Sequence, residues 1–406
     1  MHDPGPRLPR RVAHFDLDTF FVAVERARDP ALVGVPVLVG HAGARGVVAA
    51  ASYEARRFGC RSAQPMVQAL RLCPQAVVRP PDFGAYLPVS RRFHELLGEV
   101  SPVVESVGID EAYVDLTGVG DPARGAVEAA AMLRARVREE LRIAVSVCIA
   151  GTRTTAKVGS DRAKPDGLIE VPVGGDAAFL APLPIRDLPL VGPRLGEALA
   201  KAGVRTIGQA AALDERWLAQ QFGRAGEVLA QRARGIDPSP VRAGGRVQRS
   251  ISREVTFGVD VTDERELGRV LGQHAERVSA DLREAGKRAR TVTLKLRWDD
   301  FTTITRARTL ERPVHGTAEV AAAGRALLAE VAASSGLRPV RLIGLGVTNL
   351  VEDALQLGFE DALAAQSGGG AVRQDSLDRA LDGIRARFGA GSVTRGLSGR
   401  GARDGR

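Results

Sequence analysis

Two aspartates close an apolar run near the start of the chain. In HFDLDTFFVAVE, Asp16 and Asp18 end a segment that reads as a buried strand, and Phe20 and Phe21 follow directly. Carboxylates at the end of a strand are well placed to hold a divalent metal ion, which prefers oxygen ligands. The segment therefore suits two kinds of chemistry: a phosphatase that forms an aspartyl-phosphate, or an enzyme that joins nucleotides.

The phosphatase needs a hydroxyl group that this segment does not supply. Its pattern is a nucleophilic aspartate, a second aspartate two residues later, and threonine or valine two residues after that. Asp16 and Asp18 fit this pattern, but Phe20 occupies the third position and Thr19 lies one place early. No clear lysine or acid-pair motif follows in the required order. The phosphatase interpretation is therefore the weaker one.

A second acid pair favours nucleotide chemistry. Asp110 and Glu111, in SVGIDEAYVDLTG, stand at the head of another strand. Two acid-tipped strands side by side could hold two divalent ions with open positions for substrate phosphates, which suits Mg²⁺. Neighbouring strand residues point to opposite faces. We therefore expect these two acids to sit at the turn, or the ions to straddle the strand edge.

The elements that must position these acids read as α/β from Arg11 to about Gly175. VAHFD and IAVSVCIAG predict buried strands, and PVVESVGIDEAYVDLTG predicts a hairpin. GAVEAAAMLRARVREEL predicts an amphipathic helix. From Leu183 to about Pro240 the pattern changes to short helices and glycine turns, with Gly203 as the expected C-cap of one helix.

The segment 250–351 has the order β-α-β-β-α-β of a ferredoxin-like unit. In its strand TVTLKLRW, the apolar face consists of Val292, Leu294, Leu296 and Trp298. The opposite face carries Thr291, Thr293, Lys295 and Arg297. This polar, cationic face suits a phosphate backbone, and a solvated sheet face is the alternative.

Composition bounds the class of protein. The 406 residues are 44% hydrophobic and 26% charged, which is ordinary for a soluble globular chain of two to four units. The net charge of +9 favours a polyanionic partner, although an arginine-rich proteome would have the same effect. The three cysteines are scattered, and neither a signal peptide nor a membrane-spanning run is present. We expect a cytoplasmic protein with no membrane partner.

Five motifs, in unbroken order, resemble those of Y-family DNA polymerases, most closely the DNA polymerase IV branch that carries out translesion synthesis. They are HFDLDTFFVAVE, AASYEARRFGCRSAQPM, YLPVS, GIDEAYVDLTG and SDRAKPDG. The resemblance implies an α/β (α+β) right-hand polymerase. The implied domains are a disordered N-terminus (1–10), a palm-and-fingers core (11–175, fingers about 26–75), a thumb with a helix-hairpin-helix (176–241), a basic linker (242–249), a ferredoxin-like little finger (250–351) and a C-terminal tail (352–406).

The resemblance assigns the catalytic carboxylates to Asp16, Asp110 and Glu111. Together with the backbone carbonyl of Leu17 they are the implied ligands of two Mg²⁺ ions. One ion would lower the pKa of the primer 3′-hydroxyl, and the other would neutralise the triphosphate. We expect Asp18 to make a structural hydrogen bond instead.

Nucleotide contacts are implied for the aromatic pair and for three residues further along the chain. Phe21 matches the steric gate, whose ring leaves no room for a 2′-hydroxyl. Phe20 belongs to the same nucleotide-binding segment, and we expect it to pack mainly into the core. The contacts to the β- and γ-phosphates match Tyr53, Arg56 and Lys164.

DNA and clamp contacts are implied outside the catalytic core. In the thumb hairpin, Gly192 and Arg194 are the expected phosphate contacts. In the little finger they are Lys295 and Arg297. LQLGF resembles the peptide by which these enzymes dock on the replicative sliding clamp. Its expected anchors are Gln356, Leu357 and Phe359.

Several positions depart from the family pattern. Ala50 replaces a frequent threonine, Gly108 replaces serine, and Leu190 replaces the first glycine of the hairpin turn. Thr152 and Arg153 stand where an Asn-Lys pair is usual. The clamp peptide is one apolar residue short of its typical form. No metal ligand is lost, but nucleotide affinity and clamp binding are put in question.

These inferences predict a template-directed, error-prone DNA polymerase for translesion synthesis. It would transfer nucleotides from dNTPs to the 3′-end of primer–template DNA by a two-metal mechanism, as a monomer and without a proofreading exonuclease. The rival hypothesis is a diverged, catalytically weak DNA-binding accessory that associates with the sliding clamp. Primer extension separates the two.

Overall fold

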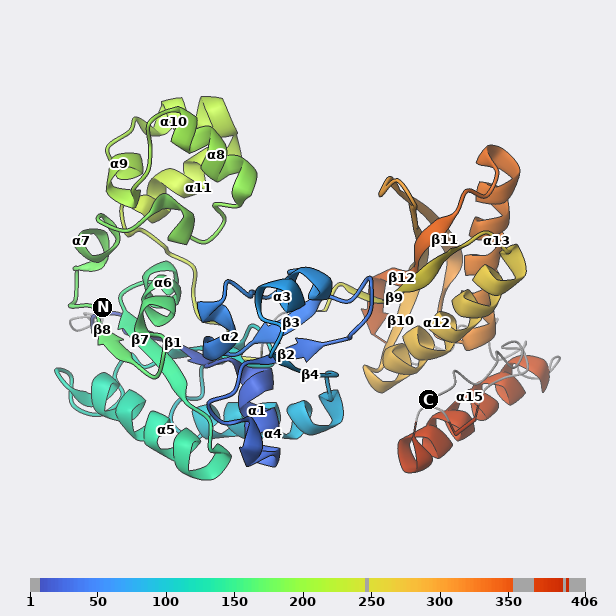
Figure 1. Cartoon of the computed structure of the whole chain (residues 1–406), viewed down its shortest axis with the longest axis horizontal. Coiled ribbons are helices and arrows are strands. Elements are labelled where there is room, and N and C mark those ends of the chain that lie inside the picture. Colours follow the sequence, from blue (N-terminus) through green and yellow to red (C-terminus); the bar gives the residue numbers. More distant parts are fainter. Residues whose placement is uncertain (1–7, 245–247, 353–368, 390–391, 394–406) are drawn as a thin grey trace, which may run out of the picture. The chain divides into compact units, whose positions relative to one another are not determined.

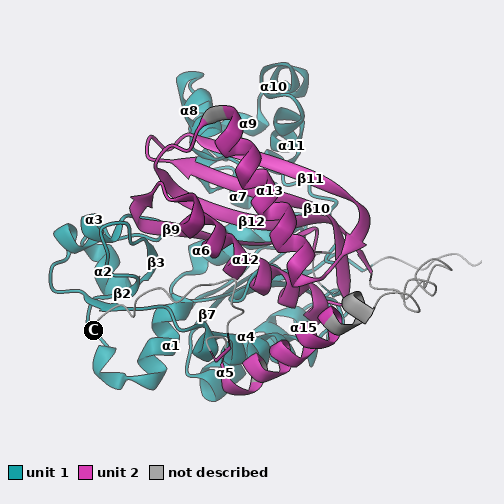
Figure 2. Ribbon diagram, turned by 90° about the vertical axis from the view of Figure 1, so that its right-hand side faces the viewer, with its two compact units in different colours: residues 1–246 teal, residues 247–406 magenta. Residues whose placement is uncertain are grey.

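The structure is a computed structural model of the chain, and its parts fall into two compact units, residues 1–246 and 247–406 (Figure 2). Each unit is described by itself. The residues that the structure describes are 8–244, 248–352, 369–389 and 392–393. Within these ranges we find no helix of the length and hydrophobicity needed to cross a membrane.

The first unit is built around a five-stranded sheet with the order β5-β6-β1-β7-β8. Its strands are β1 (Val12–Leu17), β5 (Val104–Ser106), β6 (Glu111–Asp115), β7 (Val145–Ala150) and β8 (Leu168–Glu170). Strand β1 is central and fully buried, and it pairs antiparallel with both β6 and β7. The predicted buried strands and the β5–β6 hairpin are confirmed.

Helices cover the two faces of this sheet (Figure 1). They are α1 (Phe20–Arg28), α4 (Phe83–Gly98), α5 (Gly125–Leu141) and α6 (Arg153–Ala163). Ala13, Phe15 and Leu17 of β1 share a core with α1, α4 and α5. Because side chains alternate along a strand, His14 and Asp16 point to the other face, where α6 packs. The sheet therefore presents its first carboxylate to α6.

The first unit also contains a smaller three-stranded sheet with the order β3-β2-β4. Its elements are β2 (Val37–Gly40), β3 (Val48–Ala51), α2 (Tyr53–Arg57), α3 (Met66–Leu72) and β4 (Val77–Arg79), with a 3₁₀ turn, η1 (Pro30–Leu32), before them. The predicted passage from strand to helix occurs at Ser52. Its side chain accepts a hydrogen bond from the backbone N–H of Ala55 (3.2 Å) and so caps α2.

Short helices with a separate core follow between residues 176 and 233. They are α7 (Asp176–Leu180), η2 (Ile185–Asp187), α8 (Pro193–Lys201), α9 (Ile207–Ala211), α10 (Glu215–Phe222) and α11 (Arg224–Ala233). Helix α8 ends at its C-cap Ala202, and the predicted stop, Gly203, follows with φ +80°. The left-handed backbone of Gly203 explains why the helix ends there.

The second unit has the predicted β-α-β-β-α-β order. Its elements are β9 (Ser250–Val261), α12 (Glu264–Glu284), β10 (Lys287–Trp298), β11 (Thr303–Val314), α13 (Thr317–Ser335) and β12 (Val340–Glu352). Neighbouring strands in the order β11-β10-β12-β9 are all antiparallel. The apolar face of β10 lies in one core with α12 and α13, which confirms the predicted alternation.

Two terminal segments are more ordered than expected. Arg10, placed in a disordered N-terminus, donates a hydrogen bond to the carbonyl of Asp237 (3.0 Å), so that prediction is wrong for this residue. In the C-terminal tail, α15 spans Gly369–Phe388. Asp378 of α15 accepts a hydrogen bond from the N–H of Thr317 (3.1 Å), at the start of α13. Since Gly316 cannot cap α13, α15 supplies the missing cap.

Candidate active site

The pairing of β1 with β6 brings the acids together. Asp16 lies directly opposite Glu111 in the antiparallel register, and the N–H of Leu17 donates to the carbonyl of Asp110 (2.9 Å). Asp110 sits in a bend, and β6 begins at Glu111. Because Asp110 lies before the strand, its side chain need not point to the face opposite that of Glu111. This agrees with the expectation that the two acids sit at the turn.

Helix α6 brings two lysines to the same carboxylates. The Lys157 ammonium lies 2.7 Å from Glu111 Oε2 and 3.2 Å from Asp16 Oδ2. Lys164, at the C-cap of α6, lies 2.8 Å from Asp16 Oδ2. Lys164 was assigned to the triphosphate, whereas Lys157 was missed. The signal was available, because residues seven apart lie on one face of a helix.

The acids differ in proton affinity. The His14 ring, 3.5 Å from Glu111 Oε2, and then the Lys157 ammonium lower the pKa of Glu111 to about 2. Burial, followed by the negative charges of Asp16 and Glu111, raises the pKa of Asp110 above its usual value. A further positive charge beside Asp110 would therefore favour its ionised form.

The donor set fits a divalent cation by its chemistry. Carboxylate oxygens are hard ligands of the kind that Mg²⁺ takes, and ammonium groups already neutralise two of these side chains. In the described part of the chain, no three His, Cys, Asp or Glu side chains converge closely enough to hold a metal ion. In this arrangement the lysine amines supply the positive charge.

Asp18 has the structural role that we expected. Its carboxylate is buried and accepts hydrogen bonds from Ser146 Oγ (2.9 Å) and from the backbone N–H of Asp166 (2.6 Å). Burial raises its pKa above the usual range, against the lowering effect of the Ser146 hydrogen bond. Asp18 therefore ties the end of β1 to the segment after α6.

The two phenylalanines at the start of α1 have different surroundings. Phe20 is 3% exposed and packs in the core, which leaves it no open face for a nucleotide. The half-buried Phe21 ring stacks on Tyr86 at 4.6 Å between centroids, with an interplanar angle of 16°. The Tyr86 hydroxyl donates to Glu25 Oε1 (2.7 Å). Tyr86 lies within the YLPVS motif region, and its support of Phe21 was not predicted.

Tyr53 and Arg56 lie together on α2. The Arg56 guanidinium is 5.1 Å from the centre of the Tyr53 ring, and its Nε donates to the carbonyl of Ala51 (3.0 Å). The buried Tyr53 hydroxyl makes no hydrogen bond of ordinary geometry to the described residues, but burial and then the negative charge of the neighbouring Asp18 carboxylate raise the pKa of Tyr53. Tyr53 also lines a cavity of about 500 Å³ with Asp18 and Pro165. An unused donor beside a cavity is suited to a polar ligand.

Of the four expected DNA contacts, the two in the thumb hairpin are exposed and the two in the little finger already have side-chain partners. Gly192 is the N-cap of α8, and Arg194 is exposed in its first turn. Lys295 pairs with Glu254 (2.7 Å), and Arg297 donates to Thr303 Oγ1 (2.9 Å). Both little-finger cations therefore already have partners across the sheet. The expected clamp anchors, Gln356, Leu357 and Phe359, lie outside the described residues.

Three of the departures from the family pattern have clear surroundings. Ala50 is buried in β3. A side chain at Gly108 would place its Cβ 3.3 Å from Asp110 Oδ1, so glycine leaves the Asp110 carboxylate more space. Leu190 has φ +81° and is 71% exposed, which places a strained, apolar residue in the hairpin turn.

Comparison with known proteins gives consistent matches along the chain. The impB/mucB/samB family matches residues 15–161, the C-terminal domain of that family matches 248–359, and the IMS family HHH motif matches 177–204. The chain is 40% identical to the DNA polymerase IV of Dehalococcoides mccartyi (strain ATCC BAA-2266 / KCTC 15142 / 195), over 95% of this chain and 97% of that relative. It is 42% identical to the DNA polymerase IV of Streptomyces coelicolor, over 84% and 71% of the two chains.

Solved structures show the same fold. A Y-family DNA polymerase chimera of Dbh and Dpo4 matches with a TM-score of 0.77 and 24% identity, over 84% of this chain and 99% of that one. An insertion ternary complex of Dbh DNA polymerase matches over the same shares, with a TM-score of 0.62 and 25% identity. The predicted palm, fingers, thumb and little finger architecture agrees with these neighbours.

Proposed function

The chain belongs to the impB/mucB/samB family and is a Y-family DNA polymerase of the DNA polymerase IV branch, and from this premise we propose that it copies damaged template by two-metal nucleotidyl transfer. The enzyme is a DNA-directed DNA polymerase. The single observation that best supports the mechanism is the register of β1 and β6, which sets Asp16 opposite Glu111 beside Asp110.

The proposed ligands are Asp16, Asp110, Glu111 and the carbonyl of Leu17. When bound, two Mg²⁺ ions would lower the pKa of the primer 3′-hydroxyl and neutralise the charge of the triphosphate. The three carboxylates would hold the reacting groups in line. Asp110, with its raised pKa, must be ionised to take part, and the positive charge of Lys164 favours that ionised form.

The other residues of the site would hold and select the dNTP. Lys164 and Arg56 supply positive charge for the β- and γ-phosphates, and the unpartnered Tyr53 hydroxyl can donate a hydrogen bond to a phosphate oxygen. Phe21, braced by Tyr86, would exclude the 2′-hydroxyl of a ribonucleotide by steric clash. Lys157 would exchange its contacts with the acids for contacts with incoming negative charge.

The wider assignments remain part of the same proposal. The small α2–α3 layer, within the fingers at about 26–75, is expected to close loosely over the nascent pair, which would give low fidelity. No segment is expected to act as a proofreading exonuclease. We propose that the enzyme works as a cytoplasmic monomer on primer–template DNA, with residues 176–241 as the thumb and LQLGF as the peptide that docks on the sliding clamp.

Primer extension by acid-to-amide variants tests this proposal. We expect Asp16→Asn and Glu111→Gln to abolish extension while leaving the Kd for primer–template DNA within about twofold, because neither side chain is expected to hold DNA. Glu128→Gln, an equivalent change at an exposed site on α5, should extend normally. Extension by Asp16→Asn would refute the site. Absence of extension by the wild type, with DNA binding retained, would favour the accessory hypothesis.

A further inference from the structure

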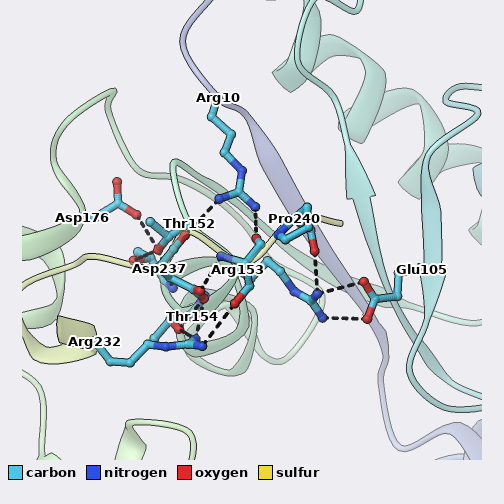
Figure 3. A network of polar contacts seen from close by, with 11 residues as sticks. Arg10, Glu105, Thr152, Arg153, Thr154, Asp176, Arg232, Asp237 and Pro240 are labelled. Carbon is cyan, nitrogen blue, oxygen red and sulfur yellow. Dashed lines mark hydrogen bonds and ion pairs between the residues drawn. The ribbon is translucent and has the colours of Figure 1, made fainter. Parts of the chain in front are cut away.

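Both connections between the catalytic sheet and the thumb helices meet at the first turn of α6 (Figure 3). The entering connection reaches α7, whose first residue, Asp176, accepts a hydrogen bond at Oδ1 from the hydroxyl of Thr152 (3.0 Å). Thr152 is the N-cap of α6 and also accepts from the N–H of Thr155 (3.2 Å). The start of α6 therefore holds the chain where it enters the thumb.

The leaving connection is the return segment, which we define as residues 237–242. Its first residue, Asp237, is 3% exposed and accepts hydrogen bonds at Oδ2 from the N–H (3.2 Å) and the hydroxyl (2.8 Å) of Thr154. The guanidinium of Arg232 contacts the same oxygen. Arg10 donates to the carbonyl of Asp237 from the opposite side (Figure 3). The return segment is thus fixed to α6 at its beginning.

Arg153 fixes the rest of the return segment. Its guanidinium forms two parallel bonds with Glu105 of β5 (2.8 and 2.9 Å) and donates to the carbonyl of Pro240 (2.8 Å). Glu105, whose side chain is almost fully buried, also accepts from the N–H of Arg242 (2.9 Å). One ion pair therefore holds two backbone groups of the return segment against the catalytic sheet.

Arg153 is also joined to the catalytic carboxylates through a row of rings. Its guanidinium lies 4.3 Å from the centre of the Tyr113 ring, on β6. The edge of that ring meets His14 at 4.6 Å between centroids, and His14 lies 3.5 Å from Glu111. The residue that holds the return segment therefore packs against the strand that carries a catalytic acid.

We propose that Arg153 is a positioning residue that fixes the return segment to the catalytic sheet and so sets the grip of the thumb on primer–template DNA. The part that concerns DNA rests on the proposed function. A planar guanidinium can hold a carboxylate with two bonds, reach a carbonyl and stack on a ring at once. A lysine ammonium, which is usual at this position of the family, cannot make all of these contacts. In this chain one guanidinium therefore holds Glu105, the carbonyl of Pro240 and the Tyr113 ring at once.

Arg153→Lys separates the guanidinium geometry from the charge. We expect trypsin to cut after Arg242 several times faster in this variant, because Glu105, which accepts from the N–H of Arg242, is no longer held by two bonds and the carbonyl of Pro240 loses its donor. We also expect the Kd for primer–template DNA to rise about threefold to tenfold, the size of one lost ordinary hydrogen bond, while kcat at saturating DNA stays near that of the wild type. Glu105→Gln should have the same effect, and the two changes combined should not add.

Arg92→Lys is the matched control. Arg92 also makes two bonds with one carboxylate, that of Glu140, but on the exposed surface of α4 and α5. It should leave tryptic cleavage and Kd unchanged. An unchanged rate of cleavage at Arg242 in Arg153→Lys would overturn the proposal, and so would faster cleavage with an unchanged Kd, or a loss of kcat alone. If the wild type extended no primer, the proposed function would fail, yet cleavage and DNA binding would still test the role of Arg153.

Discussion

The ring of Phe21 is held by a neighbouring ring rather than by the main-chain fold alone. Phe21 stacks on Tyr86, and Phe83 meets its edge at 5.7 Å. The Tyr86 hydroxyl donates a hydrogen bond to Glu25, which limits the movement of the Tyr86 ring in the stacked pair. Aromatic pairs of this kind favour one relative orientation. A ring with a fixed orientation is what rejection by steric clash requires.

Replacing Phe21 tests the sugar gate. We expect Phe21→Ala to raise incorporation of ribonucleotides relative to deoxyribonucleotides by on the order of 10²-fold, because about 3 kcal/mol of discrimination is lost with the clash. Single-nucleotide incorporation kinetics with each sugar would measure this ratio. Phe388→Ala, at an exposed position of α15 in the second unit, serves as the control. Unchanged discrimination in Phe21→Ala would show that another group excludes the ribose.

Leu190 allows a second test at a single residue. Its φ of +81° costs an L-residue about 1–2 kcal/mol, whereas glycine adopts this conformation without strain but loses about 0.5–1 kcal/mol of chain entropy on folding. We therefore expect Leu190→Gly to raise the free energy of unfolding by about 0.5–1 kcal/mol. Leu190→Ala removes the exposed side chain but keeps the strain, so it should bring no gain. Denaturant titration of the three proteins distinguishes these outcomes.

At the scale of an element, α6 serves two purposes. Its first turn holds the thumb connections through Thr152, Arg153 and Thr154. Lys157, near its middle, and Lys164, at its C-cap, contact the carboxylates. One helix therefore makes contacts both to the two thumb connections and to the carboxylates of Asp16 and Glu111.

The Asp237 carboxylate makes this attachment sensitive to acid. Burial raises its pKa, but hydrogen bonds from Ser239 and Thr154 and the charge of Arg232 outweigh this, so the pKa lies below the ordinary value of 3.8. A carboxyl group with a lowered pKa in the folded state adds stability above pH 3.8, and this stability is lost as the pH falls through the folded value.

The wild type and Asp237→Asn should therefore differ most near neutral pH and converge in acid. We expect the difference in the free energy of unfolding to be constant above about pH 5 and to shrink below the ordinary aspartate pKa. Denaturant titrations at several pH values measure it. A difference that does not change between pH 7 and pH 3 would show that the carboxylate charge plays no part in the attachment.

The sequence correctly predicted the helices and strands whose hydrophobic pattern lies within the element itself. Alternation in β10, the apolar run of β1 and the spacing in α5 are direct consequences of which side of each element is buried, and these predictions are confirmed. The bond of Arg10 to Asp237 was missed, as was the pairing of Thr154 with that residue. These contacts join positions far apart in the chain, and no periodicity in either segment specifies its partner.

The same limit applies within the active site. Motif resemblance identified Asp16, Asp110 and Glu111, and β-strand pairing brings two of them face to face. Lys157 was not assigned, because a lysine on a helix is usually solvated and only the packing of α6 on β1 turns it toward the acids. The support of Phe21 by Tyr86 was not predicted for a similar reason, because the stacking depends on how α4 packs against α1.

At the scale of the whole molecule, the two compact units have separate cores. The core of the second unit draws all of its buried members from between Ile251 and Val347, and none of them belongs to the sheet that carries the acids. The excess of positive charge, +9 over the chain, is a property of both units together. A steep fall of DNA affinity with salt is therefore expected of the intact protein.

Separate cores predict separate unfolding transitions, and one buried leucine in each unit tests this. Leu133 of α5 and Leu271 of α12 are both fully buried, each in the core of its own unit. Truncation to alanine costs about 2–5 kcal/mol, and about 2–4 °C is lost per kcal/mol in units of this size, so each variant should lower one calorimetric transition by on the order of 10 °C. Leu271→Ala should leave the transition lowered by Leu133→Ala in place. If both variants shifted the whole heat-capacity curve equally, the two units would unfold as one.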